Sequence, residues 1–348
     1  MASPQTAHDE APPEHVVAPL EIVHGGASVV RADGGLHYDA TVPRQLVHRS
    51  AIAEVFITDS AEVGPSRIDV AAQLPRGHVV GEHRSQYDPL LIIEAVRQAG
   101  VFVAHRHLGV EVGMPFVFKS LTFAITDLAG TQVGPDPGRA LFGLDVEPQR
   151  NGAGRLQALS FSGEGSIDGV RCLAGAGKLV FLNRATYTRL RERGRAARMS
   201  GQAPCRLRLT PASPGAVGRR DPRNVVITTP ERESDGRLAA SVVVDVSHAH
   251  LFDHALDHIP GNLEIEACRQ IAVAAVARTY GFAAEDLAPV GCTADLQSFA
   301  ELDLLARVSA RVGELRYDEG CDRHVVEVSV DVTQAGSLVA TATVEVAA

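Results

Sequence analysis

Two stretches of the chain, IIEAVRQAGVFVAHRHLG (92–109) and EIEACRQIAVAAVARTYG (264–281), align with each other without a gap. Both keep a Glu–x–x–Arg–Gln core inside an otherwise apolar run. A repeat of this kind indicates that one structural unit occurs twice in the chain. The polar residues of the repeated core are Glu94, Arg97 and Gln98 in the first copy, and Glu266, Arg269 and Gln270 in the second.

The two copies are surrounded by similar patterns of expected elements. In the first half, strand-like runs precede and follow a helix that begins at Pro89 and ends near His107. The expected strands of the first half are 47–59, 66–74, 116–126, 140–146, 156–167 and 170–182. The second half has a helix from about Asn262 to Tyr280 and strands at 224–228, 238–245, 289–299, 304–312, 324–332 and 337–346.

One long apolar helix among many strands predicts a hot-dog domain, since a βαβ fold would alternate helices with strands. We therefore expect the α+β class, as a tandem double hot-dog in which each central helix is wrapped by an antiparallel sheet. The two halves would form an intramolecular pseudo-dimer. The expected divisions are a disordered tail (1–40), repeat 1 (41–183), a basic linker that begins with a short helix (184–223) and repeat 2 (224–348).

Composition excludes several classes of protein. The chain has 348 residues, of which 45% are hydrophobic and 22% charged, and no apolar run is long enough to cross a bilayer. The polar start is unlike a signal peptide. Five scattered cysteines without a CxxC pair argue for the reducing cytoplasm and against a zinc site. The glycine runs at 163–169 and 175–178 suit a hairpin better than a phosphate loop. We therefore expect no metal, no cofactor and no membrane partner.

Charge is distributed unevenly along the chain. The net charge is −9, yet residues 184–223 hold eleven arginines and only two acidic residues. Such a segment is typical either of a solvated connector or of a contact with an acidic partner. The overall acidity argues against nucleic-acid binding.

The conserved spacing within each repeat places Glu, Arg and Gln on one helix face, because residues three and four apart are neighbours on a helix. Charged groups on a buried helix are costly unless they are paired or used. Two interpretations stay open: a structural ion pair duplicated with the domain, or a site.

The second helix is preceded by Pro260 and Gly261, so the N–H groups of Gly261 and Asn262 can face a ligand and stabilise the oxyanion of a thioester carbonyl. The PGxLxxEA spacing resembles the active-site helix of hot-dog 3-hydroxyacyl carrier-protein dehydratases, in which a loop histidine works with a helix carboxylate. His254 is the candidate for that histidine. The other loop histidines are expected to be surface residues: His78, His83, His250 and His258.

Together the motifs resemble the A-factor biosynthesis (AfsA-type) family. The resemblance rests on VHRSAIAEVFITD (47–59), AAQLPRGH (71–78), YDPLLIIEAVRQAGVFVAH (87–105) and HLFDHALDHIPGNLEIEACRQIA (250–272), and it extends from about residue 46 to the C-terminus. Leu74 stands where the family usually has tryptophan, Ala249 and Ala255 where prolines are common, and 262–264 is more polar than usual.

The resemblance implies an acyltransferase that moves a β-ketoacyl chain from acyl carrier protein to the hydroxyl of dihydroxyacetone phosphate. The ester would cyclise toward a γ-butyrolactone, butenolide or methylfuran autoregulator of antibiotic production. Glu266 would be the base, with its pKa raised by burial. Arg269 would hold the phosphate or orient Glu266. Gln270 would help to bind substrate, and Glu94, Arg97 and Gln98 would form a second site or support the first.

The basic segment would then dock the acidic carrier protein. Three other functions remain open from the residues. A 3-hydroxyacyl thioester dehydratase would use His254 and a carboxylate, and a thioesterase would use water as the acceptor. A non-catalytic protein would bind an acyl or butyrolactone ligand and use the Glu–Arg pairs only as structure.

Overall fold

The protein is described by a computed structural model that covers residues 35–348 except 83–84, 203, 205–207 and 319–321. Its described part contains one antiparallel sheet with the strand order β1-β2-β4-β5-β6-β3-β9-β12-β11-β10-β8-β7. The strands of the first half are β1 (Ile57–Glu62), β2 (Arg67–Leu74), β3 (Phe116–Ile125), β4 (Gly138–Arg150), β5 (Leu156–Ile167) and β6 (Val170–Phe181). Those of the second are β7 (Glu231–Arg232), β8 (Leu238–Ser241), β9 (Ala288–Leu296), β10 (Ala306–Asp318), β11 (Arg323–Gln334) and β12 (Ser337–Ala347).

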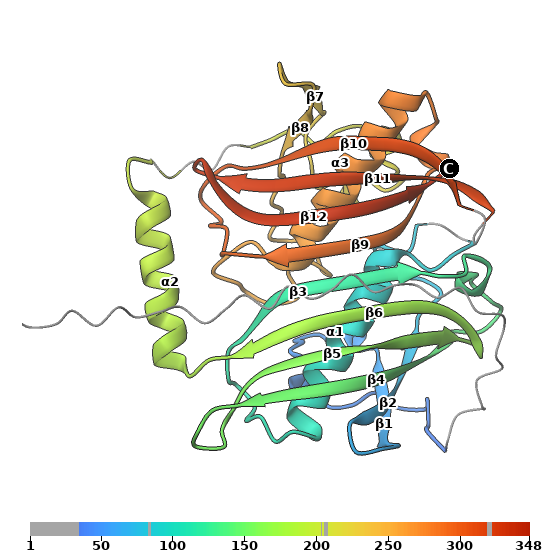
Figure 1. The fold of residues 1–348 in the computed structure, drawn as a ribbon, viewed down its shortest axis with the longest axis vertical. Coiled ribbons are helices and arrows are strands. Elements are labelled where there is room, and N and C mark those ends of the chain that lie inside the picture. The colour runs from blue at the N-terminus through green and yellow to red at the C-terminus, as the bar shows by residue number, and fades with distance from the viewer. Residues whose placement is uncertain (1–34, 83–84, 203, 205–207, 319–321) are drawn as a thin grey trace, which may run out of the picture.

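The sheet is continuous across the two halves of the chain. Strands β3 and β9 pair at its centre, with Ser120 opposite Asp295 and Ala124 opposite Gly291. The long helices α1 (Pro89–Arg106) and α3 (Gly261–Tyr280) lie beside each other, one in each half (Figure 1). This arrangement confirms the predicted tandem double hot-dog. Most of the predicted tail, 1–40, lies outside the described residues.

Both long helices are buried on nearly every side, because the sheet curves around them. Their apolar side chains join those of the sheet in one core. Helix α1 begins at Pro89, which suits the first helical position because it has no N–H to satisfy. Helix α3 ends at Gly281, whose φ of 78° lies in the left-handed region that glycine enters without strain.

Two predicted strands are wrong. The segment 47–59 begins with two single turns, η1 (Arg44–Val47) and η2 (Ile52–Glu54), and becomes a strand only at Ile57. The segment 224–228 has the turn η5 (Pro222–Asn224) and isolated bridges. In each segment, a glutamine side chain from a long helix accepts a backbone hydrogen bond that a neighbouring strand would otherwise accept. Gln98 Oε1 accepts from Phe56 N at 2.9 Å, and Gln270 Oε1 accepts from Val226 N at 3.0 Å.

The predicted basic linker, 184–223, is structured where it is described. Its first part is helix α2 (Arg184–Met199), the helix predicted at the start of the linker, and this helix stands apart from the sheet at one side of the molecule (Figure 1). Its last part contains the turn η4 (Pro214–Val217), and the following Arg219 is only 1% exposed. The end of the segment thus packs into the second repeat. Among the described residues, no helix is long and apolar enough to cross a membrane.

Candidate active site

Glu94 lies at the centre of a hydrogen-bond network that joins the two repeats. Its carboxylate accepts from Arg49 Nε at 2.8 Å, Arg97 Nε at 2.7 Å and Gln98 Nε2 at 2.7 Å. Asn262 Nδ2, at the start of α3, donates to it at 2.8 Å. Burial alone would raise the pKa of Glu94, but Arg49 and Arg97 outweigh it and lower that pKa well below its usual range. Glu94 is an ionised anchor for its neighbours.

Glu266 has the equivalent surroundings in the second repeat, and the predicted rise of its pKa is wrong. It accepts from Arg219 Nε at 2.9 Å, Arg269 Nε at 2.8 Å and Gln270 Nε2 at 2.5 Å. Burial would raise the pKa of Glu266, but the guanidinium groups of Arg219 and Arg269 outweigh burial and lower it. A carboxylate with a lowered pKa and this many donors is a poor proton acceptor at neutral pH.

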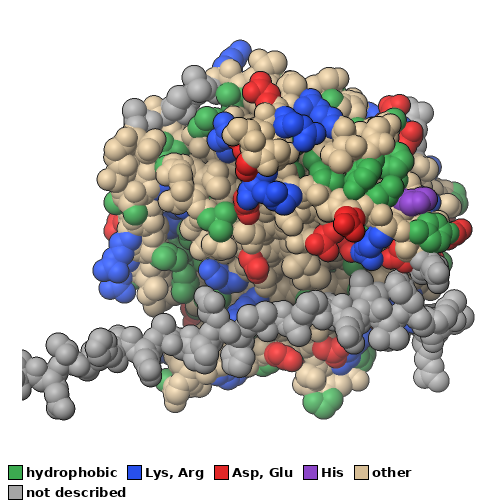
Figure 2. Space-filling model, turned by 45° about the horizontal axis from the view of Figure 1, so that its top comes forward, with side chains coloured by type: hydrophobic (Ala, Val, Ile, Leu, Met, Phe, Trp, Pro, Cys, Tyr) green, Lys and Arg blue, Asp and Glu red, His purple; other side chains and the backbone are tan. Residues whose placement is uncertain are grey.

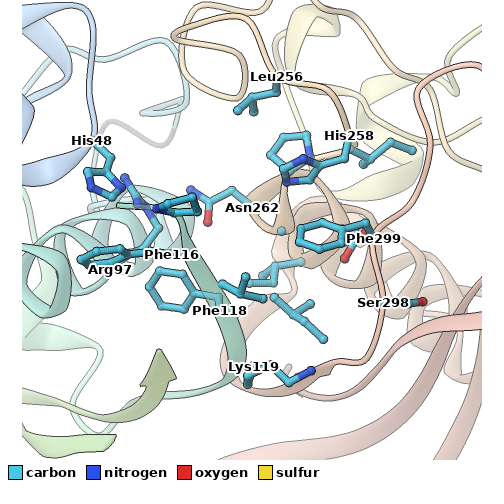
Figure 3. Close-up of a pocket in the computed structure, with 18 of the residues that line it drawn as sticks. His48, Arg97, Phe116, Phe118, Lys119, Leu256, His258, Asn262, Ser298 and Phe299 are labelled. Carbon is cyan, nitrogen blue, oxygen red and sulfur yellow. The ribbon is translucent and has the colours of Figure 1, made fainter. Parts of the chain in front are cut away.

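The largest difference between the two equivalent sites is the space beside them. A cavity of about 500 Å³ lies against the first site and is lined by Arg97, His254, Gly261 and Asn262 from the predicted set. Figure 3 shows His48 and Arg97 on one side of this cavity and Phe299 and Ser298 on the other, with Asn262 between them. Arg97 Nη1 has no hydrogen-bond partner among the described residues, although Nε and Nη2 are held by Glu94.

The second site is nearly closed. Arg269 lines a cavity of only about 20 Å³, together with Pro89 and Ile265. Arg219 is fully buried in the second site, where Nη1 contacts Asp88 at 2.7 Å and Nε contacts Glu266 at 2.9 Å. Neither Glu266 nor Gln270 lines either cavity. The structure therefore brings Arg97, His254, Gly261 and Asn262 together and separates them from the Glu266 set.

The two long helices also begin differently. At α1, the Asp88 side chain accepts a hydrogen bond from Leu90 N at 2.9 Å, and Pro89 has no N–H to offer. At α3, Pro260 provides no side-chain cap, and its carbonyl accepts only from Leu263 and Glu264. The N–H groups of Gly261 and Asn262 have no partner among the described residues and lie at the cavity. Helix α3 therefore offers two free donors and the positive end of its dipole.

His254 lies on the cavity wall beside a buried carboxylate. Its Nδ1 is 3.4 Å from Oδ2 of Asp253, whose side chain is fully buried. Asp253 is itself held by the N–H groups of Ser50 and Ala51. Because a carboxylate can only accept, this contact places a proton on Nδ1 and leaves Nε2 of His254 as the basic nitrogen.

His48 is a second cavity histidine, and our sequence reasoning did not single it out. His105 Nδ1 faces the carbonyl of Val110 at 2.7 Å and must carry a proton, so its Nε2 is an acceptor in the neutral ring. His48 Nε2 lies 2.8 Å from that acceptor and therefore donates. Burial, followed by the charge of Arg97, lowers the pKa of His48 to about 3. His48 is thus neutral, with an unprotonated Nδ1.

The surface position predicted for His250 is wrong. It is fully buried, and its Nδ1 lies 2.8 Å from Glu54 Oε2, while His78 Nε2 lies 3.2 Å from Glu54 Oε1. One nitrogen or oxygen atom of each of these three residues lies within 4.8 Å of the other two, which is close enough for all three to coordinate one metal ion. The same distances fit a hydrogen-bonded triad across the two repeats. His258 lines the large cavity, and His83 lies outside the described residues.

Arg49 and Arg219, which hold the two central carboxylates, were also missed. Each precedes a short motif, VFIT (55–58) or VVIT (225–228), that marks the same place in both repeats. That weak repeat was the available signal for them, since both arginines lie far in sequence from the glutamates that they bind.

Helix α2 covers part of the cavity, and Tyr187, Leu190 and Arg198 line it. Two of its arginines are neutralised within the protein. Arg191 contacts Glu301 at 2.9 Å, and Arg195 contacts Asp303 at 2.6 Å. Arg184, Arg189 and Arg193 are exposed. On the face shown in Figure 2, basic and acidic side chains are interspersed and do not form one extended patch.

The fold and the cavity define a double hot-dog protein whose open site lies where the start of one central helix meets the polar face of the other. The chain belongs to the A-factor biosynthesis hotdog domain family, which it matches over residues 35–134 and 201–348.

Curated relatives share the family. A protein of Streptomyces virginiae named 2-oxo-3-(phosphooxy)propyl 3-oxoalkanoate synthase is 35% identical over 240 residues, which are 68% of this chain and 77% of the relative. A protein of the same name from Streptomyces coelicolor is 30% identical over 66% of this chain and 71% of its own length. Among solved structures, a 12:0-ACP thioesterase from Umbellularia californica covers 82% of this chain and 99% of its own, with 12% identity and a TM-score of 0.48.

Proposed function

We propose that the protein transfers a 3-oxoacyl chain from an acyl carrier protein thioester to the hydroxyl of dihydroxyacetone phosphate. The product is a 2-oxo-3-(phosphooxy)propyl 3-oxoalkanoate, the ester in the names of the curated relatives. The observation that carries this proposal is the opening of a cavity of about 500 Å³ at the free N–H groups of α3, with both Arg97 and His254 among the residues that line it. These groups match an acyl acceptor that carries both a hydroxyl and a phosphate.

The start of α3 binds the thioester carbonyl. The free N–H groups of Gly261 and Asn262 stabilise the negative charge that develops on the carbonyl oxygen during attack. Gly261 allows close approach, because a Cβ at this position would lie 3.0 Å from Leu296 Cδ1, which also lines the cavity. The apolar walls at Phe118, Leu296 and Phe299 receive the acyl chain.

His254 takes the proton of the acceptor hydroxyl on Nε2, while Asp253 holds Nδ1 and stabilises the imidazolium. The hydroxyl oxygen attacks the thioester carbon, and collapse of the tetrahedral intermediate breaks the C–S bond. The proton then passes from His254 to the departing thiolate. The thioester is already activated, so the transfer requires neither a covalent enzyme intermediate nor a cofactor.

Arg97 binds the phosphate of the acceptor through its free Nη1, since a guanidinium suits a phosphate oxygen. Glu94 is a positioning residue that holds Arg97 and Asn262 at the cavity. We therefore assign phosphate binding, which the sequence suggested for Arg269, to the equivalent arginine of the first repeat, Arg97. Glu266, Arg269 and Gln270 hold the closed site together.

The released ester carries two ketones and can cyclise toward a butenolide or furan autoregulator. We place the reaction in the cytoplasm, because the described cysteines Cys172, Cys268 and Cys292 are free and buried. The exposed arginines of α2 form the docking surface for the acidic carrier protein, next to the part of the helix that covers the cavity.

The test is to incubate the protein with a 3-oxoacyl carrier-protein thioester and dihydroxyacetone phosphate and to detect the phosphorylated ester by mass spectrometry. We expect the ester with the wild type and a loss of at least about 100-fold with His254→Ala, the scale of general-base catalysis. Dehydration or hydrolysis of the thioester without ester formation would replace this proposal with one of the other thioester reactions. Binding without turnover would support a non-catalytic acyl-binding protein.

A further inference from the structure

A buried carboxyl without a partner lies in the wall of the large cavity. Glu264 is in the first turn of α3, is 4% exposed and lines the cavity. No described group is within hydrogen-bond or ion-pair distance of its carboxyl. The other buried glutamates of the long helices, Glu94 and Glu266, each bind two arginines. An unpaired buried carboxyl is costly, so its place on a cavity points to a ligand group.

A second polar group of the same cavity also lacks a partner. Arg198, on α2, donates from Nη2 to Ser298 Oγ at 2.7 Å and from Nη1 to the Gln334 carbonyl at 3.1 Å. Its Nε is buried and has no partner among the described residues. Arg198 and Glu264 do not form an ion pair with each other. The cavity wall therefore holds a carboxyl without a partner, and the charged group nearest to it in effect, Arg198, is held elsewhere by Ser298 and Gln334.

The carboxyl is protonated at neutral pH. Burial raises the pKa of Glu264 to about 8, although the charge of Arg198 opposes this rise. The other charged or titratable groups that line the cavity come from the segment before β1, from α1, β3 and α2, and from the loop before α3: His48, Arg49, Arg97, Lys119, Tyr187, Arg198, Asp253, His254 and His258. On α3 itself, the nearby Cys268 is a thiol whose pKa burial raises well above its usual value. Glu264 is thus a hydrogen-bond donor, and a donor in a cavity wall suits the lone pair of a carbonyl oxygen.

Helix geometry directs the carboxyl toward the reacting end of the substrate. Side chains of an α-helix tilt toward its N-terminus, so the side chain of Glu264 is expected to point back toward Gly261, the residue before Asn262. In the proposed function, the N–H groups of these residues hold the thioester carbonyl. The next oxygen-bearing carbon of a 3-oxoacyl chain lies only two carbons farther along.

We propose that Glu264 binds the 3-oxo oxygen of the acyl chain and makes the site selective for 3-oxoacyl over saturated acyl substrates. This inference rests on the proposed function and identifies the side chain that would recognise the acyl donor of that reaction. A saturated chain would place a methylene beside the Glu264 carboxyl and leave that carboxyl without a partner. Glu264 is a specificity-determining residue in this account, and the proton transfer belongs to His254.

The test compares a 3-oxoacyl thioester with the saturated thioester of the same length, using the wild type, Glu264→Gln and Glu264→Leu. The readout is the ratio of kcat/KM for the two donors within each variant. This ratio does not depend on how much of a variant is folded. The leucine variant removes the donor, whereas the glutamine variant keeps an N–H donor in a side chain of the same length.

We expect the wild type to prefer the 3-oxoacyl donor, Glu264→Leu to lose about 10- to 100-fold of that preference, and Glu264→Gln to retain most of it. An unchanged ratio in Glu264→Leu would overturn the inference while ester formation by the wild type leaves the proposed function standing. If the wild type forms no ester from either donor, the proposed function fails. In that case we would measure how tightly the wild type, Glu264→Gln and Glu264→Leu bind non-transferable amide analogues of the 3-oxoacyl and saturated donors, and these affinities would decide the inference. Equal loss of both affinities in Glu264→Leu would overturn it.

Discussion

Asn262, at the start of α3, donates a hydrogen bond from Nδ2 to Glu94 Oε2 of α1 at 2.8 Å. The start of α1 differs: the residue aligned with Asn262 is Leu90, and Asp88, which aligns with Pro260, contacts Arg219 at 2.7 Å. Asp88 caps α1 and binds a buried arginine, whereas Pro260 gives no side-chain cap at α3. The large cavity lies at the uncapped helix start.

The Asn262–Glu94 contact gives the first prediction. Asn262→Asp places a carboxylate against the ionised Glu94 and removes a donor from it, so kcat/KM for ester formation should fall about 10- to 100-fold and the protein should lose about 1–3 kcal/mol of stability. Steady-state kinetics and chemical denaturation measure the two effects. Asn262→Gln, which keeps a donor amide, should have the smaller effect on stability; equal effects of both variants would contradict the role given to this contact.

The equivalent arginines of the two repeats make a matched pair. Arg97→Lys keeps a positive charge beside Glu94 but loses the planar donor at the cavity, so KM for dihydroxyacetone phosphate should rise about 10-fold or more. Arg269→Lys makes the same change at the closed site and should leave that KM within about threefold. Initial rates at varied acceptor concentration test this. A larger effect on KM from Arg269→Lys would move the phosphate to the second repeat.

Glu266 should stabilise the protein in a pH-dependent way. Its folded-state pKa is lowered, so its contribution is fully present above the ordinary carboxyl pKa of 4.5 and is lost as pH falls below that value. Glu266→Gln leaves Arg219 and Arg269 without their carboxylate and should cost about 3–5 kcal/mol at pH 7, less at pH 4. Urea denaturation at several pH values measures this. A cost that does not shrink in acid would contradict the ionised state of Glu266.

Glu264 should show the opposite pH dependence. Its folded-state pKa is raised to about 8, so the folded protein holds a proton that the unfolded chain releases above pH 4.5. Wild-type stability should therefore fall by up to about 1.4 kcal/mol per pH unit between these values, relative to Glu264→Gln. Thermal or urea unfolding of both proteins from pH 5 to pH 8 checks the difference. Parallel curves would show that Glu264 is not protonated in the folded state.

The proposed carrier-protein surface makes a further prediction. Reversing the charge of exposed Arg189 and Arg193 should raise KM for an acyl carrier-protein thioester about 10-fold and weaken its dependence on salt. The same variant should use a small N-acetylcysteamine thioester as well as the wild type does. Equal losses with both donors would place the defect in the cavity, and no loss with either would remove α2 from the docking surface.

The sequence predicted both long helices well, because each combines a repeated apolar run with a clear start and stop signal. Pro89 begins α1, and Gly281 ends α3. It failed at 47–59, where alternation suggested a strand and the chain forms two single turns. No local pattern reveals that Gln98, on a helix distant in sequence, accepts a hydrogen bond from the backbone of this segment.

The candidate site likewise depends on both local and long-range features of the sequence. The sequence identified the polar helix faces and the free start of α3, because spacing and Pro-Gly chemistry are local. The ionisation of Glu266 depends on Arg219, which is distant in sequence and had been assigned to a linker. The choice between the two copies depends on which one opens into a cavity, and that follows from packing around Asp88 and Asn262.

The most direct test of the central claim is a crystal structure of the protein with dihydroxyacetone phosphate and a non-transferable 3-oxoacyl thioester analogue. We predict the phosphate on Arg97, the acyl carbonyl on the N–H groups of Gly261 and Asn262, and the acceptor hydroxyl beside His254. Phosphate bound at Arg269, or an acyl carbonyl at the start of α1, would contradict the account.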